Sequence, residues 1–134
     1  MSDIQRIETG QRMSQGVIHG HTIYLAGQVG AAGKSVTEQT RAILTQIDTL
    51  LKKCHSDKTR ILSATIYLAE IGTFAQMNSA WDAWVPQGHT PARATVEAKL
   101  AAPQYQVEVQ VIAAVQPAAQ SAVPLLARPA SLTG

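Results

Sequence analysis

The sequence predicts one α+β domain, in which a mainly antiparallel sheet is covered on one face by two helices. Three observations predict this fold. Two stretches, 36–54 and 74–85, carry apolar residues at the three- and four-residue spacing of amphipathic helices. Shorter stretches alternate apolar and polar residues, as half-buried strands do. The order of these stretches is βββαβαββ, and 134 residues are enough to build one core.

Three strands are expected before the first helix. Residues 4–9 are compatible with a strand, and two short apolar runs flank a turn centred on Gly20, which predicts a β-hairpin. Gly27, Gly30 and Gly33 then interrupt the chain. Their spacing matches neither the dinucleotide loop nor the Walker loop. We therefore expect Gly27 to offer its backbone amide to a ligand, since no side chain blocks the approach.

Residues 36–54 form the first predicted helix. Ser35 and Glu38 stand where a capping box places its N-cap and its third helical residue. Lys52 and Lys53 stand near the other end, where the helix dipole favours positive charge. The apolar stripe of this helix consists of Val36, Thr40, Ile43, Leu44, Ile47, Leu50, Leu51 and Cys54.

A strand over 61–69 and a second helix follow. The alternation within the strand predicts one apolar face. That face comprises Leu62, Ala64, Ile66 and Leu68. Thr73 and Gln76 fit a second capping box, and Gly88 is expected to close the helix. The apolar residues of the helix are Phe74, Met77, Trp81, Trp84 and Val85.

The last two strands are expected to pair with each other. Residues 93–100 and 106–115 both alternate, and Pro103 lies in the connection between them. An antiparallel hairpin there places Glu108 opposite about residue 97. The remaining face of the sheet mixes polar and apolar residues, so we expect it to be wet or to contact another subunit.

Composition excludes several classes of protein. With 11 Lys and Arg against 9 Asp and Glu, the net charge of +2 is too balanced for binding nucleic acid or anionic membrane by charge alone. A single cysteine, Cys54, excludes an internal disulfide. No apolar run approaches the ~18 residues of a membrane span, and the N-terminus lacks signal-peptide character. We expect a cytoplasmic domain over 1–116 and an extended or disordered Pro/Ala-rich tail over 117–134.

Arg93 and Glu108 are the leading candidates for chemistry. Arg93 stands at the entrance of its strand, where a guanidinium can hold a carboxylate by a bidentate fork. Glu108 lies in a strand poor in charge and is a candidate acid/base group. The alternative is a cross-strand ion pair on a solvated face. In the expected hairpin the two lie ~4 residues, or ~13 Å, apart, so a bend or a subunit boundary has to bring them together.

Other candidates have simple alternatives. His19 and His21 lack an evident third metal ligand and are expected in a turn. Cys54 is expected to be a small core residue, and a reactive thiol is the alternative. Asn78 is either a surface hydrogen-bonding residue or a brace for a site beneath the second helix. Trp81 is expected in the core or at a subunit contact.

Several segments resemble the RidA (YjgF) family over residues 3–116. They are residues 24–29, 38–44, 64–69, 74–81, 90–96 and 107–109. The most specific feature is Pro91-Ala92-Arg93 followed by Glu108 fifteen residues later. The segment 80–84, followed by Gly88 and His89, is most similar to the YoaB-like branch.

The resemblance implies a chorismate-mutase-like subunit that assembles as a homotrimer with clefts between neighbours. It implies hydrolysis of reactive 2-imino acids and their enamines, such as 2-aminoacrylate, to 2-keto acids and ammonia, without a metal or organic cofactor. Arg93 is then expected to clamp the substrate carboxylate, and Glu108 to activate water or pass protons to ammonia. Backbone groups near Gly27 and at Thr95 are expected to bind the amine and carboxylate ends of the substrate, and Asn78 is expected to support Arg93. A cleft between subunits would also bring Arg93 and Glu108 together.

Three positions depart from the family pattern. Ala26 replaces the serine that is typical before the glycine, Thr95 replaces a cysteine, and Met13 aligns near an N-terminal aromatic residue. All three are expected to line the substrate pocket, so the sequence does not determine which substrate side chain the pocket accepts. A non-catalytic protein that binds 2-keto acids or other small carboxylates is the alternative function. The ribonuclease or chaperone activity attached to some members is a third, and the balanced charge argues against a ribonuclease.

Overall fold

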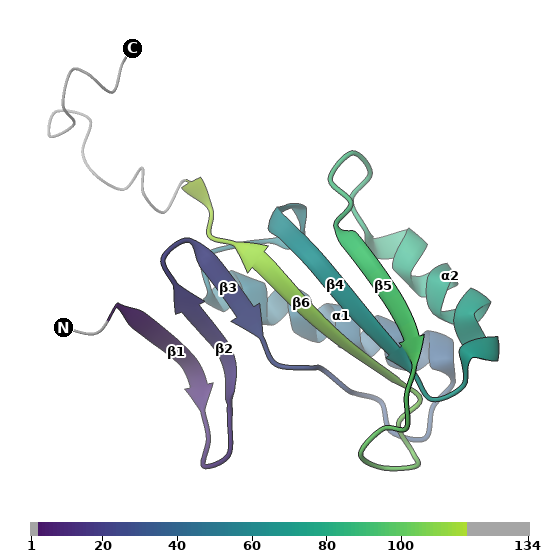
Figure 1. Cartoon of the computed structure of the whole chain (residues 1–134). Helices are drawn as coiled ribbons and strands as arrows, with labels where there is room; N and C mark the ends of the chain where they lie inside the picture. Colours follow the sequence, from purple (N-terminus) through teal and green to yellow (C-terminus); the bar gives the residue numbers. More distant parts are fainter. Residues whose placement is uncertain (1–2, 118–134) are drawn as a thin grey trace, which may run out of the picture.

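Six strands form one mixed sheet, and two helices lie behind it (Figure 1). The computed structural model describes residues 3–117. The strands are β1 (Ile4–Thr9), β2 (Ser14–His19), β3 (Thr22–Leu25), β4 (Ile61–Leu68), β5 (Ala92–Glu97) and β6 (Val107–Ala114). The helices are α1 (Val36–Lys53) and α2 (Phe74–Trp84), with 3-10 turns η1 (Lys58–Arg60) and η2 (Ile71–Thr73). The α+β class is therefore as predicted.

The order of strands in the sheet corrects one prediction. The order is β1-β2-β3-β6-β4-β5, and β4 pairs with β5 in parallel while the other neighbours are antiparallel. The expected hairpin between residues 93–100 and 106–115 is therefore wrong, because β4 lies between β5 and β6. Helix α2 provides the crossover that a parallel pair requires. Strand β6 then returns between β3 and β4, where both of its edges are hydrogen-bonded.

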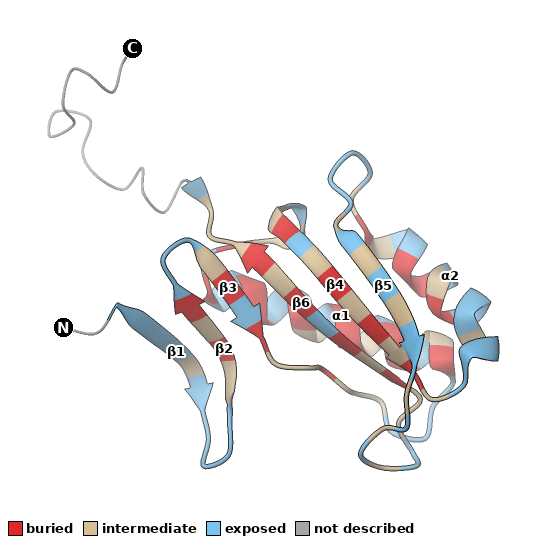
Figure 2. Ribbon diagram, viewed as in Figure 1, coloured by how far each residue is buried: buried red, intermediate tan, exposed pale blue. Residues whose placement is uncertain are grey.

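The core lies between the sheet and the helices (Figure 2). The buried residues of the two central strands β4 and β6 are Ile61, Ala64, Ile66, Leu68, Val107, Val109, Val111 and Ala113. Leu62 was expected in this face, but it is 53% exposed. The pairing of β4 with β6 shifts register between Ile61 and Ser63, so Ile61 is buried in its place.

Helix α1 matches its prediction closely. Every residue of the predicted apolar stripe is buried, and Ser35 is the N-cap. The Glu38 amide donates to Ser35 Oγ at 3.1 Å, and Ser35 Oγ donates to Glu38 Oε1 at 3.0 Å. The hydrogen bonds that the Ser35 hydroxyl and the Ser35 amide donate to the Glu38 carboxylate lower the pKa of that carboxyl below its ordinary value.

Replacing Ser35 by alanine should destabilise α1 in a pH-dependent way. Loss of the cap should lower the free energy of unfolding by about 1 kcal/mol at neutral pH. Because the folded state lowers the pKa of Glu38, the contribution of this carboxylate is present above its ordinary pKa and disappears as the pH falls through the lowered value. Urea unfolding of wild type and Ser35→Ala at neutral pH and near pH 3 should therefore show a smaller difference at low pH. An equal difference at both pH values would contradict the role of Glu38.

The ends of α2 differ from expectation. Thr73 makes no side-chain cap; its hydroxyl donates instead to the Glu70 carbonyl at 2.7 Å, because the turn η2 runs directly into the helix. The helix ends at Trp84 rather than near Gly88, since the residue before Pro86 is extended. Gly88 has φ +84° and belongs to the turn that follows, where the His89 amide donates to the Pro86 carbonyl.

Two further expectations concern the end of the domain. Residues 98–100, expected to continue β5, lie in the loop before β6. The tail was predicted over residues 117–134. Of these, only Pro117 lies in the described part of the chain. Within residues 3–117 the structure contains no helix long and apolar enough to cross a membrane.

Candidate functional site

Arg93 lies on the face of the sheet that packs against the helices. In the parallel pair, Arg93 is opposite the buried Ala64, and paired residues share a face of the sheet. The guanidinium Nη1 donates to Asn78 Oδ1 on α2 at 2.7 Å. The predicted polar face of the edge strand β5 thus points toward α2, and the predicted apolar residues Ala94 and Val96 are exposed on the other face. Asn78 braces Arg93, as one of its two interpretations proposed.

Two aromatic rings complete the surroundings of Arg93. Its guanidinium carbon lies 5.6 Å from the ring centroid of Phe74 and 5.3 Å from that of Trp81, within the range of cation–π attraction. We did not predict these contacts. Phe74, Asn78 and Trp81 stand four and three residues apart, and this spacing places them on one helix face. This spacing could have shown from the sequence that the three side chains form one group.

Thr95 follows Arg93 on the same face of β5, opposite the buried Ile66. Its hydroxyl Oγ1 is buried and has no hydrogen-bond partner in the described residues. A buried hydroxyl without a partner is energetically costly, which makes this atom a candidate contact for a ligand beside Arg93.

Glu108 lies on the opposite face of the sheet from Arg93. It pairs with Tyr67 on β4, while its neighbours Val107 and Val109 point into the core. Its carboxylate lies against Gly27, just after β3. A Cβ atom added to Gly27 would stand 2.1 Å from Glu108 Oε2, so only glycine permits this approach.

The backbone amide of Gly27 is available beside this carboxylate. Its neighbours are bonded, since the Ala26 amide donates to the Gln15 carbonyl and the Gln28 amide to the Val109 carbonyl. The Gly27 amide itself makes no hydrogen bond within residues 3–117. A donor and a carboxylate therefore lie side by side, as a site that binds and protonates a small polar molecule requires.

Arg93 and Glu108 do not meet within one chain. Their partners on β4, Ala64 and Tyr67, stand three positions apart, and the two side chains lie on opposite faces. Among the described residues, ion pairs join His19 to Asp3 and Lys53 to Glu8, and neither Arg93 nor Glu108 takes part in one. The alternative of a cross-strand ion pair is therefore wrong within the chain. Within the described part of the chain, neither of these half-buried side chains therefore has a partner of opposite charge.

The other predicted site residues are not gathered around one point. Ala26 adjoins Gly27 along the chain and is half-buried. Met13 lies in the turn between β1 and β2 and is 48% exposed. Cys54 is fully buried, and burial raises the pKa of its thiol, which fits the core interpretation. Within the described residues, no three His, Cys, Asp or Glu side chains are grouped to hold a metal ion.

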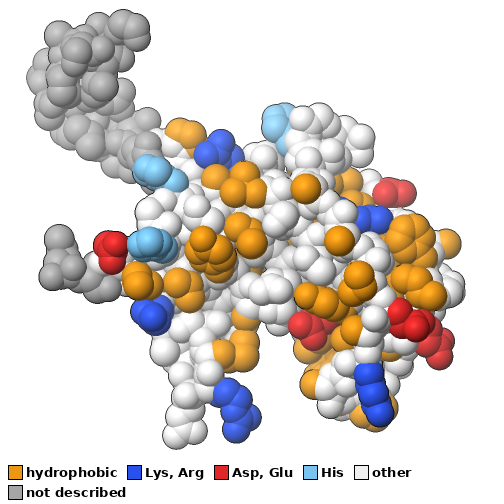
Figure 3. Space-filling model, viewed as in Figure 1, with side chains coloured by type: hydrophobic (Ala, Val, Ile, Leu, Met, Phe, Trp, Pro, Cys, Tyr) orange, Lys and Arg blue, Asp and Glu red, His pale blue; other side chains and the backbone are white. Residues whose placement is uncertain are grey.

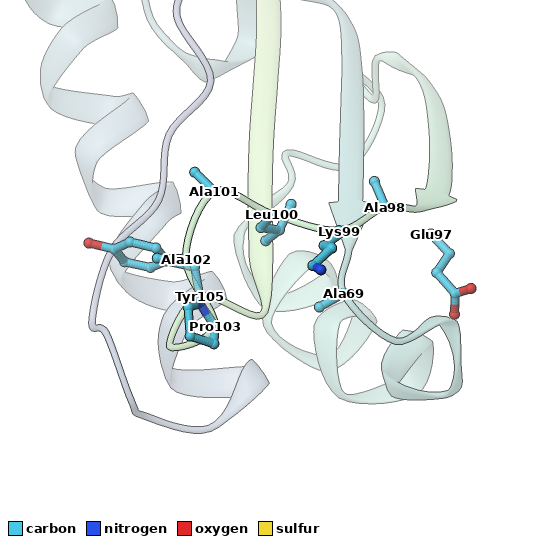
Figure 4. A pocket seen from close by; sticks show the side chains of 9 residues that line it. All are labelled: Ala69, Glu97, Ala98, Lys99, Leu100, Ala101, Ala102, Pro103 and Tyr105. Atoms are coloured by element: carbon cyan, nitrogen blue, oxygen red, sulfur yellow. The ribbon is translucent and has the colours of Figure 1, made fainter.

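A hollow of about 670 Å³ lies under the loop between β5 and β6 (Figure 4). It is lined by Ala69, Glu97, Ala98, Lys99, Leu100, Ala101, Ala102, Pro103 and Tyr105. In Figure 4 the ring of Tyr105 extends away from the side chains of Leu100 and Lys99. None of the predicted site residues is part of this lining, so the hollow is separate from both candidate groups.

The open face of the sheet carries exposed apolar side chains (Figure 3). Tyr24 is 46% exposed and pairs with Ile112, and Val96 is 42% exposed and pairs with Tyr67. Glu108 lies on this same face. Exposed apolar side chains that gather on one face of a sheet are a feature of surfaces that contact other proteins.

Comparison with known proteins shows which family this chain is related to. A family model described as Endoribonuclease L-PSP matches residues 3–115, nearly the whole described chain. The RutC family protein YoaB of Escherichia coli K12 is 48% identical over 112 residues, which cover 84% of this chain and 98% of the relative. The chain belongs to the RidA (YjgF) family. Its similarity to YoaB places it in the YoaB-like branch of that family, as the resemblance predicted.

A more distant relative and a solved structure agree with membership of the family. The 2-iminobutanoate/2-iminopropanoate deaminase of Capra hircus is 34% identical over 107 residues, covering 75% of this chain and 77% of the relative. A crystal structure of a YjgF family member from Neisseria meningitidis has a TM-score of 0.83 and 46% identity, and covers 85% of this chain and 96% of that one. The backbone of this RidA chain therefore has the architecture of its family.

Proposed function

We propose that this RidA chain hydrolyses 2-imino acids and their enamine tautomers, such as 2-aminoacrylate, to 2-keto acids and ammonia. One observation carries the proposal: within residues 3–117, a braced arginine and a carboxylate both lack an opposite charge, and the backbone amide beside the carboxylate makes no hydrogen bond. An anionic substrate with a reacting C=N bond supplies what these groups lack. The name of the goat relative supports the same reaction.

Each residue has a defined task in the proposed reaction. Asn78 occupies one nitrogen of Arg93, which leaves the rest of the guanidinium to hold the substrate carboxylate. Glu108 accepts a proton from water as the water oxygen bonds to the imine carbon. That proton passes to the nitrogen and gives a carbinolamine. Glu108 then carries the hydroxyl proton of the carbinolamine to the nitrogen as the C=O bond forms and the C–N bond breaks, so that ammonia and the 2-keto acid leave. The Gly27 amide and Thr95 bind the polar ends of the substrate.

The site is proposed to form between copies of the chain in a homotrimer. Arg93 and Glu108 lie on opposite faces of one subunit, so they reach one substrate only when they come from neighbouring subunits. The apolar face around Glu108 is the surface that a neighbouring copy covers. A ring of three subunits then contains three equivalent clefts. Ala26 and Met13 are proposed to line the part that contacts the substrate side chain.

Imine hydrolysis can be measured with a semicarbazide trap. An amino-acid oxidase generates the 2-imino acid, and the protein competes with semicarbazide for it. We expect wild type to suppress semicarbazone formation, and Arg93→Ala and Glu108→Ala to lose at least ~100-fold of this activity. Arg41→Ala and Glu70→Ala remove exposed charges of the same types and should behave as wild type.

The same variants distinguish the alternative function. A protein that only binds 2-keto acids would leave semicarbazone formation unchanged, and calorimetry with 2-oxobutanoate would show binding that requires Arg93 but not Glu108. That result would overturn the enzymatic proposal. The family model's description names a ribonuclease, but nothing in the site favours RNA over a small carboxylate.

A further inference from the structure

Gln28 is a buried glutamine whose side chain is fully used in hydrogen bonds. It is 6% exposed. Its Nε2 donates to Gln15 Oε1 and to the Ala26 carbonyl, each at 3.0 Å. Its Oε1 accepts from Gln46 Nε2 on α1 at 3.1 Å. A carboxamide chain, consisting of Gln15, Gln28 and Gln46, thus links β2, the segment after β3, and α1.

The backbone of Gln28 is fixed as firmly as its side chain. Its amide donates to the Val109 carbonyl at 2.8 Å, and its carbonyl accepts from the Val109 amide at 3.1 Å. Gln28 therefore attaches the segment to β6 at the residue next to Glu108. Through Nε2 it also holds the Ala26 carbonyl, on the other side of Gly27. Both peptide groups that flank the Gly27 Cα are constrained by this one residue.

Gln46 completes the attachment from the helix. Its Nε2 also donates to the Val29 carbonyl at 3.1 Å. A Cβ atom added to Gly30 would stand 2.4 Å from Gln46 Oε1, so this glycine leaves room for the carboxamide. Gly27 and Gly30 thus allow two different side chains to approach the same segment. The first admits the Glu108 carboxylate, and the second admits the side chain that holds the segment in place.

The carboxamide chain borders a hollow of about 340 Å³ between the β1–β2 hairpin and α1. Water in such a polar space can take over hydrogen bonds that a shorter or apolar side chain leaves unmade. A protein in which Gln28 is replaced should therefore still fold, but its Gly27 backbone should no longer be held in one position.

We propose that Gln28 is a positioning residue, which holds the free Gly27 amide and the Glu108 carboxylate in one arrangement around the substrate. This inference rests on the proposed imine hydrolysis. It assigns a role to a residue that does not touch the substrate, since its side chain is buried and its polar atoms are bonded to Gln15, Ala26 and Gln46. Gln28 acts through Gly27 and Glu108.

The test compares Gln28→Met with Gln39→Met. Gln39 is an equally buried glutamine, whose side chain bonds to the backbone of Lys34, Gln104 and Gln106. Both variants should have similarly lowered melting temperatures. We expect kcat for imine hydrolysis to fall roughly 10- to 100-fold in Gln28→Met, with a smaller change in KM, because Arg93 still binds the carboxylate. Gln39→Met should keep kcat near that of wild type.

Amide hydrogen exchange supplies a measurement that does not depend on catalysis. In Gln28→Met the amides of residues 26–30 should exchange faster, while those of α1 stay as protected as in wild type. A wild-type kcat despite faster exchange would overturn the positioning role, as would equal losses of kcat in the two variants. If wild type itself fails to hydrolyse imines, the proposed function fails separately. The positioning role is then supported only if 2-oxobutanoate binds more weakly to Gln28→Met than to Gln39→Met, and is rejected if the two bind it equally.

Discussion

Mixing two inactive variants of this RidA protein should restore imine hydrolysis. Arg93→Ala keeps Glu108, and Glu108→Ala keeps Arg93. Because these side chains lie on opposite faces of one chain, a site built from two copies can take each wild-type residue from a different subunit. In a trimer that contains both variants, one cleft of the three has both wild-type residues, so purified mixed trimers should regain roughly a third of wild-type activity.

The mixed protein is best prepared by expressing both variants together with different affinity tags and purifying in two steps. Each variant expressed alone is the control and should stay inactive. Light scattering on the same samples should give three times the mass of a single chain. No recovery of activity in a confirmed mixed oligomer would contradict a site shared between copies. The mass of a single chain would contradict both the trimer and the shared site.

Replacing Gly27 by alanine should remove most of the activity while the fold remains intact. The new Cβ would stand 2.1 Å from Glu108 Oε2 and 2.9 Å from its Cδ. The end of a flexible side chain yields more easily than the backbone, so the carboxylate moves and the segment stays bonded to β6 through Gln28. We expect a loss of ~100-fold or more in kcat, the scale of a displaced acid/base group.

Gly72→Ala is the matched control. No heavy atom lies within 4 Å of a Cβ added there, and its backbone is not left-handed, so activity and stability should stay near wild type. The double variant Gly27→Ala with Glu108→Ala should be no less active than Glu108→Ala alone, because both changes act on one carboxylate. Full activity in Gly27→Ala would show that the position of Glu108 beside this amide is not needed.

Local patterns predicted the elements that depend on local interactions. The capping box at Ser35 and the stripe that ends at Cys54 are present as expected, because the box consists of contacts within one helix and the helical spacing alone puts the stripe on one face. The box expected at Thr73 is wrong, since the preceding turn η2 takes up its hydroxyl. Leu62 is exposed because a register shift with β6 reverses the alternation at that point. Such a shift depends on the partner strand and leaves no mark in the strand's own sequence.

The candidate site shows the same division. Arg93, Glu108, Gly27 and Asn78 were chosen from the sequence, and the structure brings them together as two pairs. The sequence did not show that β4 separates β5 from β6, and so it gave the wrong reason for the distance between Arg93 and Glu108. The glutamines of the carboxamide chain were also missed, because buried glutamines have no periodic signal.

The sequence by itself determined the family, the α+β class, the first helix and the identity of the two charged residues. These follow from residue types and short-range spacing, which the chain carries regardless of how its strands pair. The tertiary structure alone decided the strand order, the opposite faces of Arg93 and Glu108, and the attachment of Gly27 by Gln28. These depend on contacts between segments far apart in sequence, where the burial of whole faces, rather than local preference, selects the partner.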